Sequence, residues 1–334
     1  MPRIAGIGLV ALDVVADDDS DEVIGEWAGG STGNLMAILA YLGWDASPIA
    51  RLDSGEVSAT IKADFKRWGV NQRWLSLQPT AEAAIYIERL RHDREGAVYH
   101  RFERYCPECG ARLPGYRPVT IAALEGVLEG IAECDVLFID RPSPGAVVAA
   151  EYAREVGKLV FFEPSARGER RHLESLARAA DIVKYSAERL TREDREVIAE
   201  ATPSVEIETL GSEGLRFRTR AKWHKLPALS IDARDTAGAG DWTSAGILHL
   251  LRGDLSKSAL TANRMRGVLA TAQAFGAISC RYAGARGVME HLTAKRVLEV
   301  AKQLSKQRGH EIRQRPHNSK AAKSRPQFSC HGCQ

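Results

Sequence analysis

Between residues 119 and 209 the chain alternates short apolar runs with amphipathic stretches, and this alternation restricts the possible folds more than any other feature. The runs "DVLFID", "KLVFFEP", "DIVKYS" and "SVEIETL" predict buried strands, and the stretches between them predict helices. Repeated β-α units of this kind form a parallel sheet with helices on both faces. We therefore expect a three-layer α/β fold that binds ligands at the carboxyl ends of its strands.

The rest of the body fits the same class. Residues 4–10 predict a strand, and residues 81–102 predict a β-hairpin of partly exposed strands around "HDREG". Further helices are predicted over residues 31–42, 56–68, 119–132, 236–251, 256–279 and 293–308. With 334 residues, the chain is long enough to bury a sizeable core.

The carboxyl-terminal residues differ in composition from the body. Residues 306–325 contain seven Lys and Arg against the single acid Glu311, a local charge of +6 in a chain whose net charge is +3. Because this segment has almost no apolar residues, we divide the chain into a body at 1–305 and a basic tail at 306–334. The tail lacks interleaved aromatic residues, so a solvated tail is favoured over a nucleic-acid-binding one.

The amino-terminal residues do not predict export. Asp13 interrupts the first apolar stretch, and acids follow where a signal-peptide cleavage site would stand. No apolar run reaches the roughly 18 residues that a membrane span needs. We expect a cytoplasmic protein.

Four of the six cysteines form two Cys-x-x-Cys pairs, in "CPECG" and "SCHGCQ". Such pairs favour a structural zinc site in a reducing compartment over disulfide bonds. We predict one zinc ion bound by Cys106, Cys109, Cys330 and Cys333, with His331 and His317 as reserve ligands. The alternatives are unrelated exposed thiols, or a zinc site shared between two chains of a homodimer. Cys134 and Cys280 lie in apolar contexts and are predicted to be core residues.

Two glycine-rich stretches are candidates for a phosphate or cofactor loop. "GIGLVA", residues 6–11, fits a dinucleotide-binding fingerprint, but that fingerprint needs a helix to follow directly. Here Asp13 and "ADDDSDE" follow, which do not form an amphipathic helix. A nicotinamide-dependent oxidoreductase is therefore disfavoured.

The second stretch is "DARDTAGAGDWTSAGILHLL", residues 232–251. Gly238, Ala239 and Gly240 lead into a strongly helical run, where backbone N–H groups and the helix dipole attract an anion. Asp241 lies in the first turn of that helix. A helix-stabilising charge is one interpretation of Asp241. The combination of an anion site with an adjacent carboxylate favours phosphoryl transfer, which needs a charge-neutralising cradle and a base for the incoming hydroxyl.

"DTAGAGD", together with "GGSTGNLMAILAYLGWDASPIARLDSG", resembles the ribokinase or PfkB family of carbohydrate and nucleoside kinases. The resemblance covers roughly residues 4–305. It implies a mostly parallel sheet with a small β lid over the sugar. In this chain the lid corresponds to about residues 81–119, and the predicted zinc-binding turn of Cys106 and Cys109 is an insertion in it. It also implies ATP- and Mg²⁺-dependent transfer to a hydroxyl of a sugar or nucleoside, and leaves room for a monovalent cation.

The resemblance assigns roles by position. Asp241 corresponds to the catalytic base, with Gly238, Ala239 and Gly240 as the anion hole. The acceptor site corresponds to Asp13, Gly29, Gly30 and Asn34, and the nucleotide site to Thr209, Gly211, Gly214, Gly276 and Gly284. Arg167 corresponds to a phosphate contact. From the residues alone, Asn34 fits a helix-start residue equally well, and Asp53 fits an ordinary turn residue.

One motif departs from the family. The family carries N-x-x-E where this chain has "YSAER", which places Ser186 at the asparagine and Arg189 at the glutamate. Because that motif supports the magnesium water shell, either Glu188 or Glu163 replaces it, or the nucleotide phosphates hold the metal. The departure also leaves open a non-catalytic protein of the same fold that binds nucleotide or sugar as a regulator.

Overall fold

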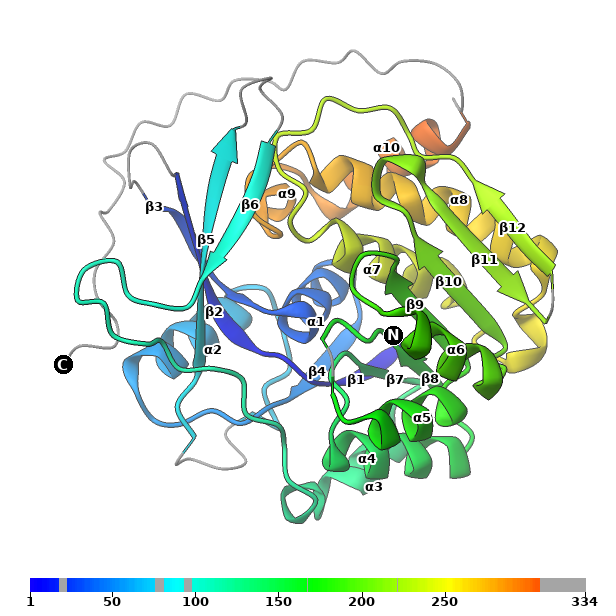
Figure 1. Ribbon diagram of the computed structural model, residues 1–334, viewed down its shortest axis with the longest axis horizontal. Helices are drawn as coiled ribbons and strands as arrows, with labels where there is room; N and C mark the ends of the chain where they lie inside the picture. The colour runs from blue at the N-terminus through cyan, green and yellow to red at the C-terminus, as the bar shows by residue number, and fades with distance from the viewer. Residues whose placement is uncertain (18–22, 76–80, 93–97, 167, 221, 307–334) are drawn as a thin grey trace.

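The main sheet of the computed structural model has eight strands in the order β12-β11-β10-β9-β8-β7-β1-β4 (Figure 1). The structure describes all residues except 18–22, 76–80, 93–97, 167, 221 and 307–334. Strands β10 to β4 in this order run parallel, and β11 and β12 are antiparallel. The strands are β1 (Arg3–Ile7), β4 (Asp45–Ile49), β7 (Val136–Ile139), β8 (Leu159–Phe162), β9 (Ile182–Ser186), β10 (Val205–Thr209), β11 (Leu215–Thr219) and β12 (Lys222–Leu226). The predicted mostly parallel sheet is confirmed.

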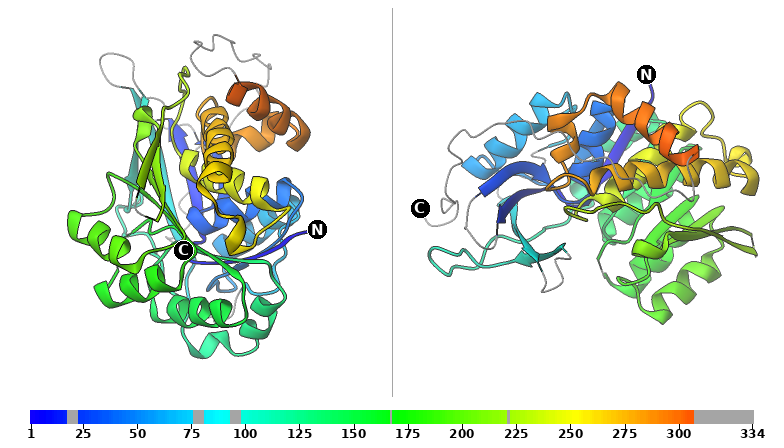
Figure 2. Two further views of the ribbon diagram at one scale, coloured as in Figure 1. Left: turned by 90° about the vertical axis from the view of Figure 1, so that its right-hand side faces the viewer. Right: turned by 90° about the horizontal axis from the view of Figure 1, so that it is seen from above.

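Helices cover both faces of this sheet, as predicted (Figure 2). One face is covered by α1 (Ser31–Tyr41), α7 (Ala239–Leu251), α8 (Ala262–Ser279) and α10 (Ala294–Lys306), with the short α9 (Gly287–His291) beside α8. The other is covered by α3 (Val127–Ala132), α4 (Pro144–Glu155), α5 (Arg170–Ala179) and α6 (Arg192–Ala201). An apolar cluster lies on each side of the sheet. Within the described part of the chain, none of the helices is long and apolar enough to cross a membrane.

A second sheet of four strands, which we call the lid sheet, has the order β3-β2-β5-β6 (Figure 1). It consists of β2 (Ala11–Asp17), β3 (Val23–Gly29), β5 (Ala84–His92) and β6 (Val98–Glu103). β2 and β5 are parallel, and the two outer pairs are antiparallel. The helix α2 (Glu56–Arg67) packs against this sheet. The predicted hairpin at 81–102 is thus confirmed as the pair β5 and β6.

The chain passes from the main sheet to the lid sheet at Gly8. A Cβ atom at this position would lie 1.5 Å from Oδ1 of the fully buried Asp140, so only glycine fits. The predicted strand at residues 4–10 therefore ends at Ile7, and the chain continues into β2 from Ala11 rather than into a helix. This course removes the context that a dinucleotide-binding loop requires.

Two predicted helices are shorter than expected. Residues 119–132 form a 3₁₀ turn at Ala122–Leu124 and then α3, because Gly126 between them has a φ of 78° and breaks the helix. The helix predicted from residue 256 begins at Ala262, where the Thr261 side chain accepts a hydrogen bond from the Arg264 N–H and caps it.

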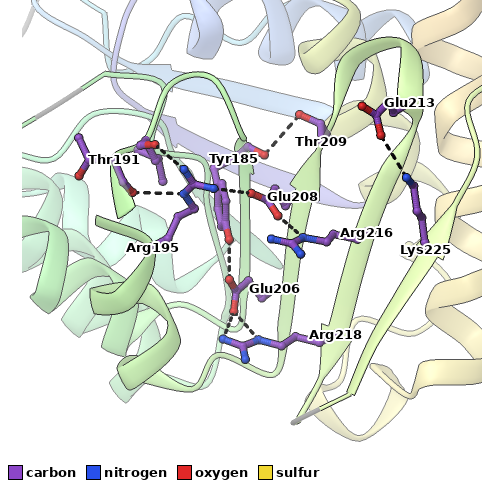
Figure 3. Close-up of polar contacts among 11 residues, drawn as sticks. Tyr185, Thr191, Arg195, Glu206, Glu208, Thr209, Glu213, Arg216, Arg218 and Lys225 are labelled. Atoms are coloured by element: carbon purple, nitrogen blue, oxygen red, sulfur yellow. Dashed lines mark hydrogen bonds and ion pairs between the residues drawn. The ribbon is translucent and has the colours of Figure 1, made fainter. Parts of the chain in front are cut away.

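Buried ion pairs join α6 and β11 to β10 within the main sheet (Figure 3). Glu206 and Glu208 on β10 are 2% and 1% exposed. Arg218 pairs with Glu206, which also accepts a hydrogen bond from the Tyr185 hydroxyl at 2.6 Å. Arg216 of β11 and Arg195 of α6 both pair with Glu208. Because each buried carboxylate of β10 has at least one arginine partner, neither is left as an unpaired buried charge.

Candidate active site

The amino-terminal end of α7 forms an open backbone site on the face of the main sheet that α1 and α8 also cover. Gly238 has a φ of 72°, and a Cβ atom there would lie 2.3 Å from the Cβ atom of Ala285. Among the residues that the structure describes, no side chain caps the helix, and Gly240 is exposed. The first-turn N–H groups of an α-helix lack helical partners and carry partial positive charge. The N–H groups of Gly238 and Gly240 therefore offer a site for a phosphate group, whereas the N–H of Ala239 donates to the backbone O of Thr236 at 3.3 Å.

Asn34 joins Asp241 to Asp13. Its Nδ2 donates a hydrogen bond to Oδ2 of Asp241 at 3.0 Å, and its side chain also hydrogen-bonds to Asp13. Asn34 is 5% exposed, and its buried Oδ1 has no hydrogen-bond partner among the described residues. The residue predicted as the base and two of the residues predicted for the acceptor thus come together, with one buried acceptor atom left for a ligand.

The glycine pair makes room for Asp13. A Cβ atom on Gly29 would lie 1.8 Å from Oδ2 of Asp13, and one on Gly30 would lie 2.6 Å from the backbone O of Leu9. The N–H of Gly30 donates to Oδ2 of Asp13 at 2.9 Å. The two glycines therefore position the carboxylate of Asp13 at the start of α1. Asp53, in contrast, accepts hydrogen bonds from Gly55 and Ser58 and serves as a turn residue before α2.

Both carboxyl groups have raised pKa values. Burial, and secondarily the charge of Glu163, raises the pKa of Asp241 to about 8, although Lys184, the Asn34 hydrogen bond and Arg189 lower it. Burial raises the pKa of Asp13 to about 6 against the Gly30 N–H bond and the charge of Arg286. At neutral pH Asp13 is mainly ionised, and Asp241 titrates near the pH at which a general base works best.

Lys184 and Glu163 form a buried ion pair beneath the first turn of α7. Lys184 is 2% exposed and pairs with Oε1 of Glu163, while the Ser244 hydroxyl donates to Oε2 at 2.5 Å. A Cβ atom on Gly240 would lie 3.7 Å from both Nζ and Oε1. Sequence reasoning missed Lys184, whose only signal is a lysine inside the apolar strand "DIVKYS". Because both oxygens of Glu163 have protein partners, it does not offer a spare carboxylate for a metal.

The "YSAER" segment places a positive charge near the site. Ser186 ends β9, and Nη1 of Arg189 donates to the backbone O of Ser165 at 3.4 Å. Glu188 is exposed. Within the described ranges, no group of three or more His, Cys, Asp or Glu residues could hold a metal ion. Arg167 lies outside the described residues.

The residues predicted for the nucleotide lie in two segments. Thr209 ends β10, and the tight turn to β11 uses Gly211 and Gly214, whose φ values are 57° and 98°. Gly284 has a φ of 70° and donates its N–H to Oδ2 of Asp235 at 2.6 Å. Gly276 is buried in α8, where a Cβ atom would lie 2.8 Å from the backbone O of Ala239, so it permits close packing of α8 on α7. The nucleotide-binding role of these residues stays a prediction.

The first cysteine pair forms a tight turn after the lid sheet. The N–H of Cys106 donates to the backbone O of Ala111 at 2.8 Å, and the N–H of Ala111 lies 3.4 Å from Sγ of Cys109. Gly110 has a φ of 71°. Cys109 is disulfide-bonded in the structure, and Cys106, Cys134 and Cys280 lie outside that bond. Cys330, Cys333, His317 and His331 lie outside the described residues. Cys134 and Cys280 are 1% and 7% exposed, which confirms them as core residues.

Comparison of the sequence with known proteins finds one family. Residues 1–292 match the pfkB family carbohydrate kinase description. The fructokinase of Escherichia coli is 31% identical over 312 residues, which cover 87% of this chain and 97% of that protein. The ATP-dependent ribose-1-phosphate kinase of Halopiger xanaduensis is 26% identical over 314 residues, 86% of this chain and 94% of that protein.

Solved structures share the fold. A fructokinase from Xylella fastidiosa with bound ATP superposes with a TM-score of 0.72 at 17% identity, over 91% of this chain and 99% of that chain. A ribokinase from Thermotoga maritima gives a TM-score of 0.67 at 15% identity, over 91% and 100% of the two chains. The similarity therefore extends over nearly the whole length of these proteins.

Proposed function

Because the chain belongs to the pfkB family of carbohydrate kinases, we propose that it transfers the γ-phosphate of ATP to a hydroxyl of a sugar or nucleoside, with Asp241 as the base. The observation that carries this assignment is the Asn34 amide, which bonds to both Asp241 and Asp13 beside the uncapped end of α7. The Asn34 side chain thus aligns Asp241 as the proposed base, Asp13 as the carboxylate that binds the sugar or nucleoside, and the anion site at the start of α7.

The chemistry follows from this arrangement. The carboxylate of Asp13 and the free Oδ1 of Asn34 accept hydrogen bonds from hydroxyls of the acceptor, which orients it. Asp241 takes the proton of the reacting hydroxyl. We propose that the N–H groups of Gly238 and Gly240 stabilise the negative charge that develops on the transferred group, and that the Ala239 N–H joins them only if it leaves the backbone O of Thr236. ATP, when bound, supplies the phosphoryl group.

The names of the relatives support a sugar as the acceptor. They include several fructokinases, a ribose-1-phosphate kinase and an aminoimidazole riboside kinase from Salmonella typhimurium. All three acceptor types carry neighbouring hydroxyls that a single carboxylate can bind together. We propose a hydroxyl-rich monosaccharide or riboside as the substrate class.

The residues that the structure describes do not form a complete magnesium site of their own. Glu163 is committed to Lys184 and Ser244, and Arg189 stands where the family has a glutamate. We therefore propose that a magnesium ion is held mainly by the nucleotide phosphates. The dependence of turnover on Mg²⁺ concentration, measured at a fixed ATP concentration, tests whether the reaction needs this ion. The monovalent cation stays a prediction, and a potassium ion is named with the fructokinase of Vibrio cholerae.

Arg189 also supports a second candidate, a non-catalytic protein that binds nucleotide or sugar. The two functions are separated by an assay of ADP release with D-fructose, D-ribose and aminoimidazole riboside as acceptors. We expect release only when an acceptor is present, and a loss of at least about a hundredfold in kcat for Asp241→Asn. The exposed Asp232 provides the matched control Asp232→Asn, which should keep wild-type turnover. ATP binding without turnover on any acceptor would favour the regulator.

We separately propose the zinc site formed by Cys106, Cys109, Cys330 and Cys333. The turn at Cys106 and Cys109 has the N–H to sulfur contact and left-handed glycine that suit two thiolates on one metal ion. Zinc binding with Cys330 and Cys333 requires Cys109 to be reduced. We expect one zinc ion per chain in protein purified without chelator under reducing conditions, and its loss on truncation at Pro326. Protein that contains no zinc under those conditions would contradict this zinc site.

A further inference from the structure

The lid sheet buries a carboxyl group that the proposed chemistry does not use. Glu88 on β5 is 3% exposed. Its Oε1 atom has no hydrogen-bond partner among the described residues. A buried polar atom without a partner costs free energy, and a leucine or glutamine at this position would avoid burying a carboxyl. Such an atom therefore calls for a ligand or a functional reason.

The register of the lid sheet places Glu88 on the same face as Asp13. Asp13 pairs with Tyr86 and Val15 pairs with Glu88 across β2 and β5. Because alternate residues of a strand share a face, Asp13, Val15, Tyr86 and Glu88 lie on one side of the sheet. Leu12, Val14, Ile85 and Ile87 lie on the other side and belong to the same apolar cluster as Ile61 and Phe65 of α2. Glu88 therefore faces the main body, as Asp13 does, at a distance of two residues along the strand, roughly 7 Å.

Burial and neighbouring negative charges keep the carboxyl of Glu88 protonated. Burial first, and then the negative charges of Asp235 and Asp13, together raise the pKa of Glu88 to about 9. Asp235 precedes α7 and accepts hydrogen bonds from the N–H groups of Ala237 and Gly284. Across β6, the residue opposite Glu88 is the uncharged Phe102. At neutral pH Glu88 can thus donate a hydrogen bond as well as accept one, whereas Asp13 can mainly accept.

We propose that Glu88 is a specificity-determining residue of the acceptor site, whose carboxylic acid donates a hydrogen bond to a neutral oxygen of the bound sugar or riboside. The inference rests on the proposed function, because the ligand is the acceptor of that reaction. Asp13 and Asn34 select hydroxyls that donate. Glu88 selects an oxygen that accepts, and its acidic neighbours disfavour an anionic group at that point of the acceptor.

Two substitutions test the donor role. Glu88→Gln keeps an N–H donor and should keep KM for the best of D-fructose, D-ribose and aminoimidazole riboside within about threefold. Glu88→Leu removes the donor and should raise that KM by about tenfold, the effect of one lost hydrogen bond, with kcat changed far less. Glu82→Leu is the matched control, because Glu82 is exposed and just precedes β5. It should leave KM unchanged.

The dependence of KM on pH separates this role from a purely structural one. In the wild type, KM should rise above about pH 9, where Glu88 loses its proton, and this rise should be absent from Glu88→Gln. Thermal melting of Glu88→Leu should be no lower than that of the wild type, because the variant removes a buried unpartnered group. An unchanged KM in Glu88→Leu, or an equal collapse of kcat in both variants, would overturn the proposal.

The proposed function can fail independently of this inference. If wild-type protein turns over none of the three acceptors, the kinase assignment fails, and calorimetric binding of the same acceptors to wild type and Glu88→Leu still tests Glu88. Weaker binding by Glu88→Leu alone would support its role. Equal binding by both proteins would refute it.

Discussion

Replacing Asp241 with asparagine should make the protein more stable at the same time as it removes activity. The raised pKa, about 8 against 3.8, means that the folded state keeps a proton which the unfolded chain has lost at pH 7. Each unit of this difference corresponds to about 1.4 kcal/mol, so the 3.2 units between 3.8 and pH 7 amount to about 4 kcal/mol. Because Asp241 is only partly buried, solvent screening reduces this cost to roughly 2 to 4 kcal/mol. Asparagine has no ionisable proton and so avoids this destabilisation, and its Oδ1 can still accept the Asn34 hydrogen bond.

The sign of the effect fixes how it should vary with pH. A carboxyl with a raised pKa destabilises the folded state above its unfolded pKa, and the destabilisation grows until the folded pKa is reached. The gap in unfolding free energy between Asp241→Asn and wild type should therefore be small near pH 4 and largest near pH 8.

Urea denaturation at a series of pH values measures this gap, with Asp232→Asn as the exposed control. The same preparations should show a fall in kcat of at least about a hundredfold for Asp241→Asn. A gap that does not change with pH, or an Asp241→Asn protein less stable than wild type at pH 8, would show that the carboxyl of Asp241 does not have a raised pKa in the folded state.

Two further substitutions test the charges around the site. Arg189→Gln removes a positive charge that lowers the pKa of Asp241, so the acid limb of the kcat/KM profile should move to higher pH by about 0.5; the exposed Arg192→Gln should leave it in place. Arg286→Met leaves the carboxylate of Asp64 without its ion-pair partner and removes the 2.9 Å bond to the Ala28 backbone O, so we expect a loss of about 3 to 5 kcal/mol in urea denaturation. The exposed Arg296→Met should be nearly neutral, and an equally small loss for Arg286→Met would contradict the structural role of Arg286.

The sequence was sufficient for the elements that follow a simple period. The alternation from residue 119 gave the parallel strands, and the small residues before Asp241 marked the start of α7 within a few residues. Gly126 shows the limit of periodicity: the apolar pattern continues across it, but its left-handed backbone divides the predicted helix. Strands β2 and β3 were not predicted, because the acidic run between them reads as a loop and their pairing depends on long-range contacts.

In the candidate site, too, some residues could be identified from the sequence and others depend on long-range contacts. Asp241, Asn34 and Asp13 were identified by resemblance, but the hydrogen bonds that unite them depend on a fold that brings residues 207 positions apart together. Lys184 and Glu88 were missed because each is a charged residue in an apolar strand. The sequence does not show whether such a residue is buried with a partner or exposed to solvent. Their roles depend on partners in other elements, which only the structure identifies.

The order of strands in the lid sheet has a consequence for how specificity can evolve. β2 and β5 are neighbours, yet Ala11 pairs with Ala84 across an interval of chain that contains α1, β4 and α2. The lid sheet is therefore not a contiguous cassette that recombination could exchange between relatives. Transfer of the whole lid sheet between relatives would need two separate segments of the chain, residues 11–29 and 84–103, to be exchanged together.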